Sequence, residues 1–302
     1  MKIDQAYDHC RAIAHKHGAN FSVGFRFLPP VKRRAVYAAY AYCRVADDIA
    51  DEPVDGWQLA VGGSDSGAVP RQPPTDNRQQ RLDDWQRELD ACYAGAPAHP
   101  ITIALADALQ HFTIPKSAFI ALLDGCRQDM VKTRYATFDE LLQYCELVAA
   151  SISDISLAIF GYRSDEAIGH GRNLAIALQL TNVTRDIGDD LTRDRVYVPS
   201  IELLAFGVHE RDLFARAETE EVRNLIEFQI DRARSYFQRA EPLLRELDFD
   251  ARFPTLLMGG VYATVLAKLA KDPLIAIRRR LSLTPLQKVL VVGTRVLRPH
   301  FV

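Results

Sequence analysis

The sequence lacks the features of several large protein classes. It has no excess of one charge, with 37 Lys and Arg against 39 Asp and Glu, so its composition gives no reason to expect a nucleic acid partner. Its five cysteines form no CxxC or Cys/His pattern, which favours reduced thiols in a cytoplasmic protein. No apolar run reaches the roughly 20 residues of a membrane span. A peripheral contact at the inner face of the membrane stays open.

The sequence also has little that would build a sheet. Only residues 196–198 show a short extended pattern, and Pro199 ends it. Apolar residues instead recur with helical spacing, and Thr137 with Glu140 forms a capping-box pattern before one such segment. Helical patterns cover 31–50, 81–94, 100–111, 116–131, 138–161, 165–191, 219–246 and 255–279. We expect one all-α domain over 1–302, a helical bundle around an internal cavity.

One segment departs from the helical pattern. Residues 53–80 contain four Gly and four Pro in 28 positions, which is typical of a mobile loop. Such a loop is either a solvated connector or a flap over an active site. Its glycines do not form a dinucleotide fingerprint, because no strand precedes them and no helix opens on them.

Negative charge is concentrated in two short clusters. Asp47 and Asp51 are four residues apart in a helical segment, and Asp186 and Asp190 have the same spacing, so each pair shares a helix face. Like charges at this spacing destabilise a helix unless something compensates them. Mg²⁺ is bound by one or two carboxylates together with water and substrate phosphate oxygens. Two such helices facing each other would form a metal–diphosphate site, whereas either pair alone is also compatible with a solvated helix face.

The residues around the two pairs favour the metal site. The first pair lies on an apolar, aromatic helix, with Arg44 three residues before Asp47, and Arg185 directly precedes Asp186. Arginine forms bidentate hydrogen bonds to phosphate oxygens. A polar stripe runs through Gln179, Asn182, Asp186 and Asp190. Burying these side chains without partners would be costly.

The ordered set of motifs resembles the trans head-to-head prenyl synthase family, that is, the squalene and phytoene synthases. The resemblance rests on four segments, 21–29, 40–51, 124–149 and 179–199, with a weaker similarity at Tyr262 and 278–280. Where many members carry glycine, residues 149–153 read Ala-Ala-Ser-Ile-Ser. We therefore expect a differently shaped cavity wall at this point.

The resemblance implies an isoprenoid-synthase fold whose central cavity holds two prenyl diphosphates. It implies that Mg²⁺ is held by Asp47, Asp51, Asn182, Asp186 and Asp190. The residues expected to carry the chemistry are the four paired aspartates together with Arg44 and Tyr40. The positions expected to bind substrate are Ser22, Phe25, Arg44, Tyr144, Gln179, Asn182, Arg185, Tyr262 and Arg279. For 278–280 a helix C-terminus stabilised by cations is the competing interpretation.

The implied reaction is the head-to-head condensation of two farnesyl diphosphates, through a cyclopropyl (presqualene) diphosphate, to squalene or a related C30 product. The alternative is phytoene synthesis from two geranylgeranyl diphosphates. NADPH is required only if the cyclopropyl intermediate is reduced, and the oligomeric state is open. A catalytically silent protein of the same fold would be expected to lose aspartates from one or both clusters, and here all four are present.

Overall fold

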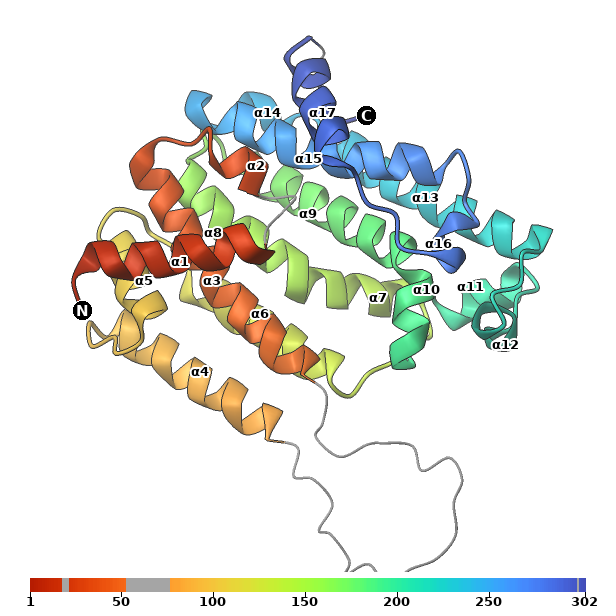
Figure 1. The fold of residues 1–302 in the computed structure, drawn as a ribbon, viewed down its shortest axis with the longest axis horizontal. Helices are drawn as coiled ribbons and strands as arrows, with labels where there is room; N and C mark the ends of the chain where they lie inside the picture. Colours follow the sequence, from red (N-terminus) through yellow and green to blue (C-terminus); the bar gives the residue numbers. More distant parts are fainter. Residues whose placement is uncertain (18–21, 53–76, 298) are drawn as a thin grey trace, which may run out of the picture.

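The fold is a bundle of α-helices, as expected (Figure 1). The computed structural model describes residues 1–17, 22–52, 77–297 and 299–302. Within these ranges the only β-type pairings are two isolated bridges, Arg134 with Val196 and Tyr162 with Leu247. The first bridge falls in the short extended segment predicted around residue 196.

The N-terminal half packs around α3 (Pro30–Asp51), the helix that carries the first aspartate cluster. Its neighbours are α1 (Ile3–His17), α2 (Ser22–Phe25), α4 (Arg78–Tyr93), α5 (Pro100–Leu109) and α6 (Lys116–Asp129). Tyr42 of α3 stacks on Trp85 of α4 with ring centroids 4.8 Å apart. Each of these two side chains also donates a hydrogen bond to the backbone carbonyl of the other residue. Because this face of α3 is fixed by packing, its opposite face is free to line a cavity.

A continuous helical segment crosses the middle of the bundle. It consists of α7 (Phe138–Cys145), a π-helical turn η1 (Glu146–Ala150) and α8 (Ser151–Phe160). Thr137 caps it by accepting the N–H of Glu140 at 3.3 Å, as the sequence predicted, but the Glu140 carboxylate accepts the N–H of Ala136 and not that of Thr137, so the capping box is incomplete. By length and composition alone Phe138–Phe160 is apolar enough to cross a membrane. The segment packs against α6 and α9 inside the bundle, as a core helix does.

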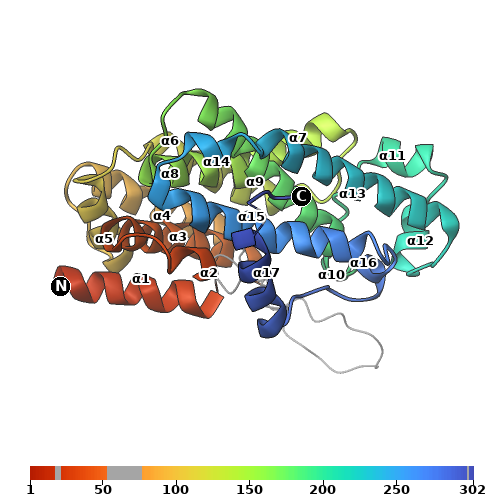
Figure 2. The ribbon, with the colours of Figure 1, turned by 90° about the horizontal axis from the view of Figure 1, so that it is seen from above.

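The C-terminal half is built on three long helices that run side by side (Figure 2). They are α9 (Glu166–Arg185), α13 (Glu220–Ala240) and α15 (Phe249–Leu269). Short helices connect and extend them: α10 (Ile187–Asp190), the 3₁₀ turn η2 (Leu191–Arg193), α11 (Ser200–Ala205), α12 (Glu210–Phe214), α14 (Leu243–Glu246), α16 (Ile275–Arg278) and α17 (Pro285–Leu297).

Four of the predicted segments are divided or shortened in the structure. The prediction of single helices over 165–191, 219–246 and 255–279 was wrong in each case, because α9, α13 and α15 end at Arg185, Ala240 and Leu269, and separate short helices follow Asp186, Pro242 and Pro273. Proline lacks the N–H that a helix interior needs, which accounts for the last two interruptions. The segment 138–161 contains the π-helical turn in place of regular helix. Most of the predicted loop at 53–80 lies outside the described residues, and α4 already begins at Arg78.

Candidate active site

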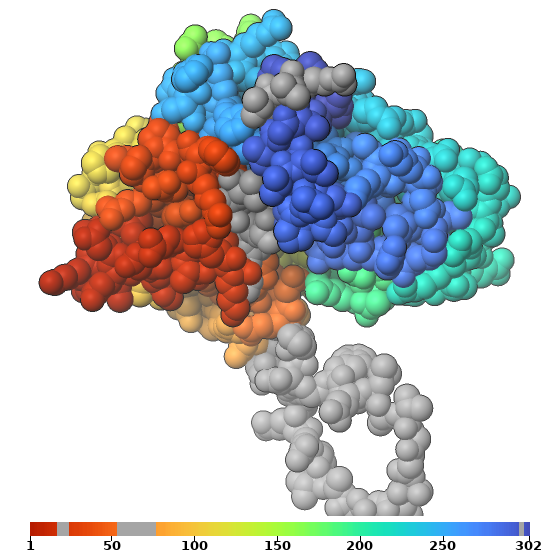
Figure 3. Space-filling model, turned by 45° about the horizontal axis from the view of Figure 1, so that its top comes forward, coloured from red at the N-terminus to blue at the C-terminus, as the bar shows by residue number. Residues whose placement is uncertain are grey.

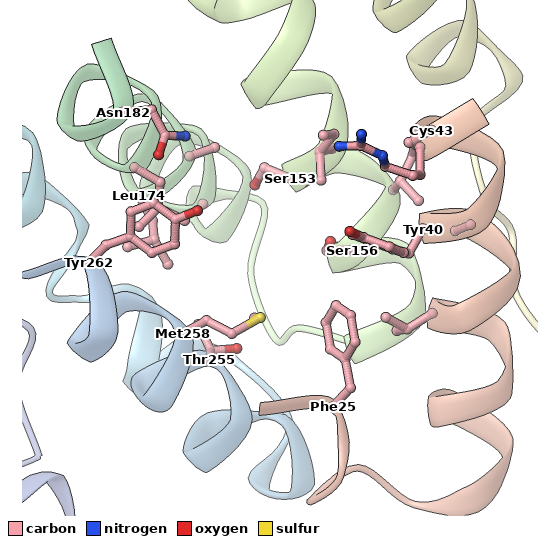
Figure 4. A pocket seen from close by; sticks show the side chains of 18 of the residues that line it. Phe25, Tyr40, Cys43, Ser153, Ser156, Leu174, Asn182, Thr255, Met258 and Tyr262 are labelled. Atoms are coloured by element: carbon pink, nitrogen blue, oxygen red, sulfur yellow. The ribbon is translucent and has the colours of Figure 1, made fainter. Parts of the chain in front are cut away.

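A cavity of about 650 Å³ lies among α2, α3, α8, α9 and α15. Figure 4 shows the side chains that surround it: Phe25 from α2, Tyr40 and Cys43 from α3, Ser153 and Ser156 from α8, Leu174 and Asn182 from α9, and Thr255, Met258 and Tyr262 from α15. Most of the remaining lining is aliphatic. One end differs, because Arg44, Asp47, Arg185 and Asp186 gather there. The cavity thus joins a charged end to a long apolar interior.

On the α3 side, Asp47 is a carboxylate with little compensating charge. Burial, reinforced by the neighbouring Asp51, raises the pKa of Asp47 to about 7, although Arg44 opposes the rise. The guanidinium of Arg44 is ion-paired with Asp48, and its Nε is buried without a hydrogen-bond partner among the described residues. The thiol of Cys126 on α6 donates to Asp47 Oδ1 at 3.6 Å. On this wall, therefore, the negative charge of Asp47 is only partly compensated, and the neighbouring Arg44 has an N–H donor without a partner within the described ranges.

On the α9 side, arginines surround the second aspartate pair. Arg185 Nε donates to Asp186 Oδ1 at 2.6 Å, and Arg280 Nε lies 3.1 Å from the same oxygen. The N–H of Asp190 donates to the carbonyl of Asp186 at 2.8 Å, which keeps the two aspartates one turn apart although α9 has ended. Burial, followed by repulsion from Asp186, raises the pKa of Asp190 to about 7. The amide oxygen of Asn182, one turn before Asp186, is buried with no hydrogen-bond partner among the described residues.

Arg195 connects the two clusters. Its Nη1 lies 3.3 Å from Asp51 Oδ1 and 2.9 Å from Asp129 Oδ2. The hydroxyl of Tyr197 donates to Asp129 Oδ1 at 2.6 Å. Arg195 also lowers the pKa of Asp190 against the dominant effect of burial. The end of α3, the end of α6 and the segment after η2 therefore meet at one group of charges, in which the Arg195 and Asp129 side chains are each 13% exposed and the Asp51 side chain is 41% exposed.

The residues present fit a divalent cation that prefers oxygen ligands. Among the described residues no compact group of three or more His, Cys, Asp or Glu side chains offers a complete metal cage. One or two carboxylates per ion, completed by water and phosphate, is the arrangement typical of Mg²⁺. The Asn182 amide oxygen is buried without a partner among the described residues, and burial raises the pKa of Asp47 and Asp190, so a nearby cation would stabilise all three side chains.

Comparison with known proteins identifies the family of this chain. The family model described as squalene/phytoene synthase matches residues 14–287. The chain belongs to this family. It is 31% identical to the 15-cis-phytoene synthase of Synechococcus elongatus, over 98% of this chain and 94% of that protein. It is 32% identical to the 15-cis-phytoene synthase of a Synechocystis species, over 98% of this chain and 86% of that protein.

Solved structures of squalene/phytoene synthase relatives share the fold. The crystal structure of a squalene synthase from Alicyclobacillus acidocaldarius superposes with a TM-score of 0.77, at 29% identity, over 89% of this chain and 95% of that one. A dehydrosqualene synthase solved with a ligand gives a TM-score of 0.83 at 23% identity, over 99% of this chain and 98% of that one.

The structure of this squalene/phytoene synthase family member brings many of the predicted residues together. The cavity lining includes Phe25, Tyr40, Arg44, Asp47, Asn182, Arg185, Asp186 and Tyr262. The other predicted residues with described side chains lie outside that lining: Asp51, Tyr144, Gln179, Asp190 and Arg279. Asp51 and Asp190 belong to the adjoining group of charges around Arg195. The side chain of Ser22 lies outside the described residues.

Three of the remaining predicted residues lie outside the cavity lining. Two of them contact residues of the site, and the third is exposed to solvent. Tyr144 is buried and stacks on Tyr197 with ring centroids 5.5 Å apart. Gln179 accepts a hydrogen bond from Asn182 Nδ2 at 3.4 Å, which orients the unpaired amide oxygen. Arg279 is exposed, and the neighbouring Arg280 contacts Asp186 in its place.

Some residues of the site were not assigned a role from the sequence. These are Cys126, Asp129 and Arg280. Asp129 lies within a segment that resembles the family, so the sequence shows an acidic residue there but does not show which residues it contacts. Arg280 had a local signal in the run of three arginines at 278–280. Cys126 had none, because nothing in the sequence places α6 beside α3.

Proposed function

We propose that this protein joins two allylic prenyl diphosphates head to head in a Mg²⁺-dependent reaction. The observation that carries the proposal is the cavity itself: aspartates and arginines from α3 and from the end of α9 lie in its lining, and most of the other lining side chains are apolar. A diphosphate bound at the charged end would place its prenyl chain in the apolar interior. Membership of the squalene/phytoene synthase family supports the same substrate class.

The residues divide into three proposed roles. Asp47, Asp51, Asn182, Asp186 and Asp190 would hold the metal ions. When bound, Mg²⁺ supplies positive charge that neutralises the departing diphosphate. Arg44 and Arg185 would donate hydrogen bonds to phosphate oxygens, since Arg44 Nε has an unused donor and Arg185 already faces the acidic end. Tyr40 and Tyr262 lie in the lining beside the apolar interior.

The apolar interior has a chemical task of its own. The carbon–oxygen bond of one substrate breaks with its electron pair on the diphosphate, and the double bond of the second substrate attacks the allylic cation. Loss of a proton then closes a cyclopropyl prenyl diphosphate. Departure of the second diphosphate, rearrangement of the resulting cation and loss of a second proton would give the hydrocarbon. Side chains such as Leu174, Leu178 and Val265 exclude water from this region, which protects the cation from hydrolysis.

We propose geranylgeranyl diphosphate as the substrate and a C40 hydrocarbon of the phytoene type as the product. The cavity lining follows α9 from Gly171 to Arg185, a length of about 21 Å at the helical rise. A chain of four isoprene units is ~20 Å long when extended, from ordinary carbon–carbon bond lengths. The names of the curated relatives support this choice over the C30 product expected from the sequence.

Farnesyl diphosphate is the second candidate substrate. It is favoured by the similarity to the squalene synthase of Alicyclobacillus acidocaldarius, whose structure aligns over most of both chains. A shorter chain of three isoprene units would leave the end of the cavity near Gly171 unfilled. Reduction of a C30 intermediate to squalene would require NADPH, whereas loss of a proton would not.

The deciding experiment offers the purified protein each substrate separately. Geranylgeranyl or farnesyl diphosphate is added with Mg²⁺, with and without NADPH, and products are identified by mass spectrometry. We expect a C40 product from geranylgeranyl diphosphate without NADPH, and no turnover in EDTA. A higher kcat/KM for farnesyl diphosphate would overturn the C20 assignment, and full activity in EDTA would overturn the metal-dependent mechanism.

A further inference from the structure

One side chain of the cavity lining carries a hydroxyl group that has no partner. Thr255 of α15 is 2% exposed, and its Oγ1 is buried with no hydrogen-bond partner in the part of the chain that the structure describes. Figure 4 shows this side chain projecting from α15 into the cavity beside Met258. Most of the surrounding lining is apolar. A hydroxyl in such surroundings is costly unless it is hydrogen-bonded, so its partner has to come from whatever fills the cavity.

The position of Thr255, rather than its residue type, leaves the hydroxyl unpaired. The helices α9 and α15 contain three other threonines. In Thr181, Thr184 and Thr264 the hydroxyl donates to the carbonyl four residues earlier, at 2.7, 2.8 and 2.7 Å. This is the usual bond of a threonine inside a helix. The structure shows no such bond from Thr255 to any described residue, so its hydroxyl is available to the cavity.

Thr255 lies far from the charged end of the cavity. Helices of both halves of the chain line the cavity, and Figure 3 shows α1 to α3 in red and orange on one side and the C-terminal helices in blue on the other. On the C-terminal side, Tyr262 interacts electrostatically with Arg185, which belongs to the charged end. Thr255 precedes Tyr262 by two helical turns on α15, which corresponds to about 10 Å of helix.

The contact between α9 and α15 gives the depth of Thr255 on the α9 side. A Cβ on Gly259 would lie 3.3 Å from Leu174 Cδ1, so these two residues face each other. About one turn earlier on each helix come Thr255 and Gly171, and both line the cavity. Gly171 is about 21 Å from Arg185 along α9, and a prenyl chain extends by ~5 Å per isoprene unit. A chain anchored at the charged end therefore reaches Thr255 with its fourth unit.

We propose that Thr255 is a specificity-determining residue that opposes binding of the longest chain. In the free protein its hydroxyl bonds to water in the cavity. The fourth isoprene unit of geranylgeranyl diphosphate displaces this water and offers no hydrogen bond in return, whereas farnesyl diphosphate is too short to reach it. The length of the cavity favours four units, and Thr255 reduces that preference. The inference rests on the proposed function, since it assumes that the cavity holds prenyl chains.

The kcat/KM values for the two substrates test this role. Thr255→Val keeps the shape of the side chain and removes the hydroxyl. The ratio of kcat/KM for geranylgeranyl diphosphate to that for farnesyl diphosphate should rise about tenfold, because an apolar side chain has no water to lose. This ratio does not depend on the fraction of the variant that is folded. An unchanged or lower ratio would overturn the proposal.

Two further variants separate the loss of the hydroxyl from other effects. Thr255→Ser keeps a hydroxyl, so the ratio should stay close to that of the unmodified protein. Thr264→Val makes the same exchange on the same helix, at a hydroxyl that is bonded to Gly260 and lies outside the cavity lining. It should leave the ratio unchanged. If either variant raised the ratio as much as Thr255→Val does, the proposal would be wrong, because the hydroxyl of Thr255 would not be the cause.

Binding of unreactive analogues separates this inference from the proposed function. Thio analogues of the two substrates, in which sulfur replaces the oxygen between carbon and phosphorus, are titrated by calorimetry in the presence of Mg²⁺. Relative to the farnesyl analogue, the geranylgeranyl analogue should bind Thr255→Val about tenfold more tightly than it binds the unmodified protein. This shift without turnover of either substrate would refute the reaction and leave the role of Thr255 intact. Turnover of both substrates without any shift would do the reverse, and a protein that binds neither analogue would refute both.

Discussion

Replacing Asp47 by asparagine is expected to abolish activity and yet stabilise the metal-free protein. Activity should fall because asparagine removes the negative charge of a proposed Mg²⁺ ligand. Stability should rise because the charge is unfavourable where it stands. Burial is the main reason, and Asp51 one turn away adds repulsion. Arg44, the nearest cation, is committed to Asp48.

The magnitude follows from the pKa of Asp47. Burial raises the pKa from an ordinary value of 3.8 to about 7. A raised pKa means that the folded state favours the neutral acid, so stability is lost as the pH rises through the folded value. The full rise corresponds to ~4 kcal/mol above about pH 7. Because Asp47 keeps partial contact with solvent, which screens the charge, we expect a smaller gain of ~2 kcal/mol for Asp47→Asn at about pH 8.

Urea unfolding in EDTA measures the effect at several pH values. Asp47→Asn should be more stable than the unmodified protein at about pH 8, and the difference should shrink as the pH falls towards about 4. Asp48→Asn is the matched control, since Asp48 is on the same helix, 43% exposed and ion-paired with Arg44. That variant should gain no stability. The reasoning would be refuted if Asp47→Asn were less stable than the unmodified protein at about pH 8, or if the difference in their free energies of unfolding did not change with pH.

Three further substitutions test separate contacts. Cys126→Ala removes the hydrogen bond to Asp47, so the Mg²⁺ concentration for half-maximal activity should rise several-fold. Cys126→Ser should return that concentration to the value of the unmodified protein. Equal Mg²⁺ titrations for all three proteins would contradict this role of Cys126. Asp129→Ala leaves Arg195 without its closer partner and should lower the free energy of unfolding by ~3 kcal/mol in urea, in line with broken buried pairs; a loss near zero would show that the pair is not needed for folding. Gly171→Ala places a Cβ 2.7 Å from the side chains of two cavity residues, so kcat/KM should fall more for geranylgeranyl than for farnesyl diphosphate. An equal fall for both substrates would show that Gly171 does not limit the length of the bound prenyl chain.

The local features of this protein were readable from its sequence. Helical periodicity predicted an all-α fold because a helix face repeats over a few residues, and the long helices were found where it was strongest. Breaks near Asp186 and Pro242 were missed, because an apolar pattern continues across them. The spacing of the aspartates fixed each pair on one helix turn, and the adjacency of Arg185 to Asp186 became an ion pair with an N···O distance of 2.6 Å.

Tertiary structure decided every contact between distant segments. Arg195 joins Asp51 and Asp129 across 144 and 66 positions of the chain, and no local rule links residues so far apart. The backbone at Arg279 is extended, with φ −163° and ψ 152°, and side chains alternate along extended backbone. Arg280 therefore reaches Asp186, and Arg279 does not. The sequence thus determined which charges exist and on which helix turn they lie. Only the packing of α3, α6 and α9 determined how deeply they are buried, and burial raises the pKa of Asp47 and of Asp190.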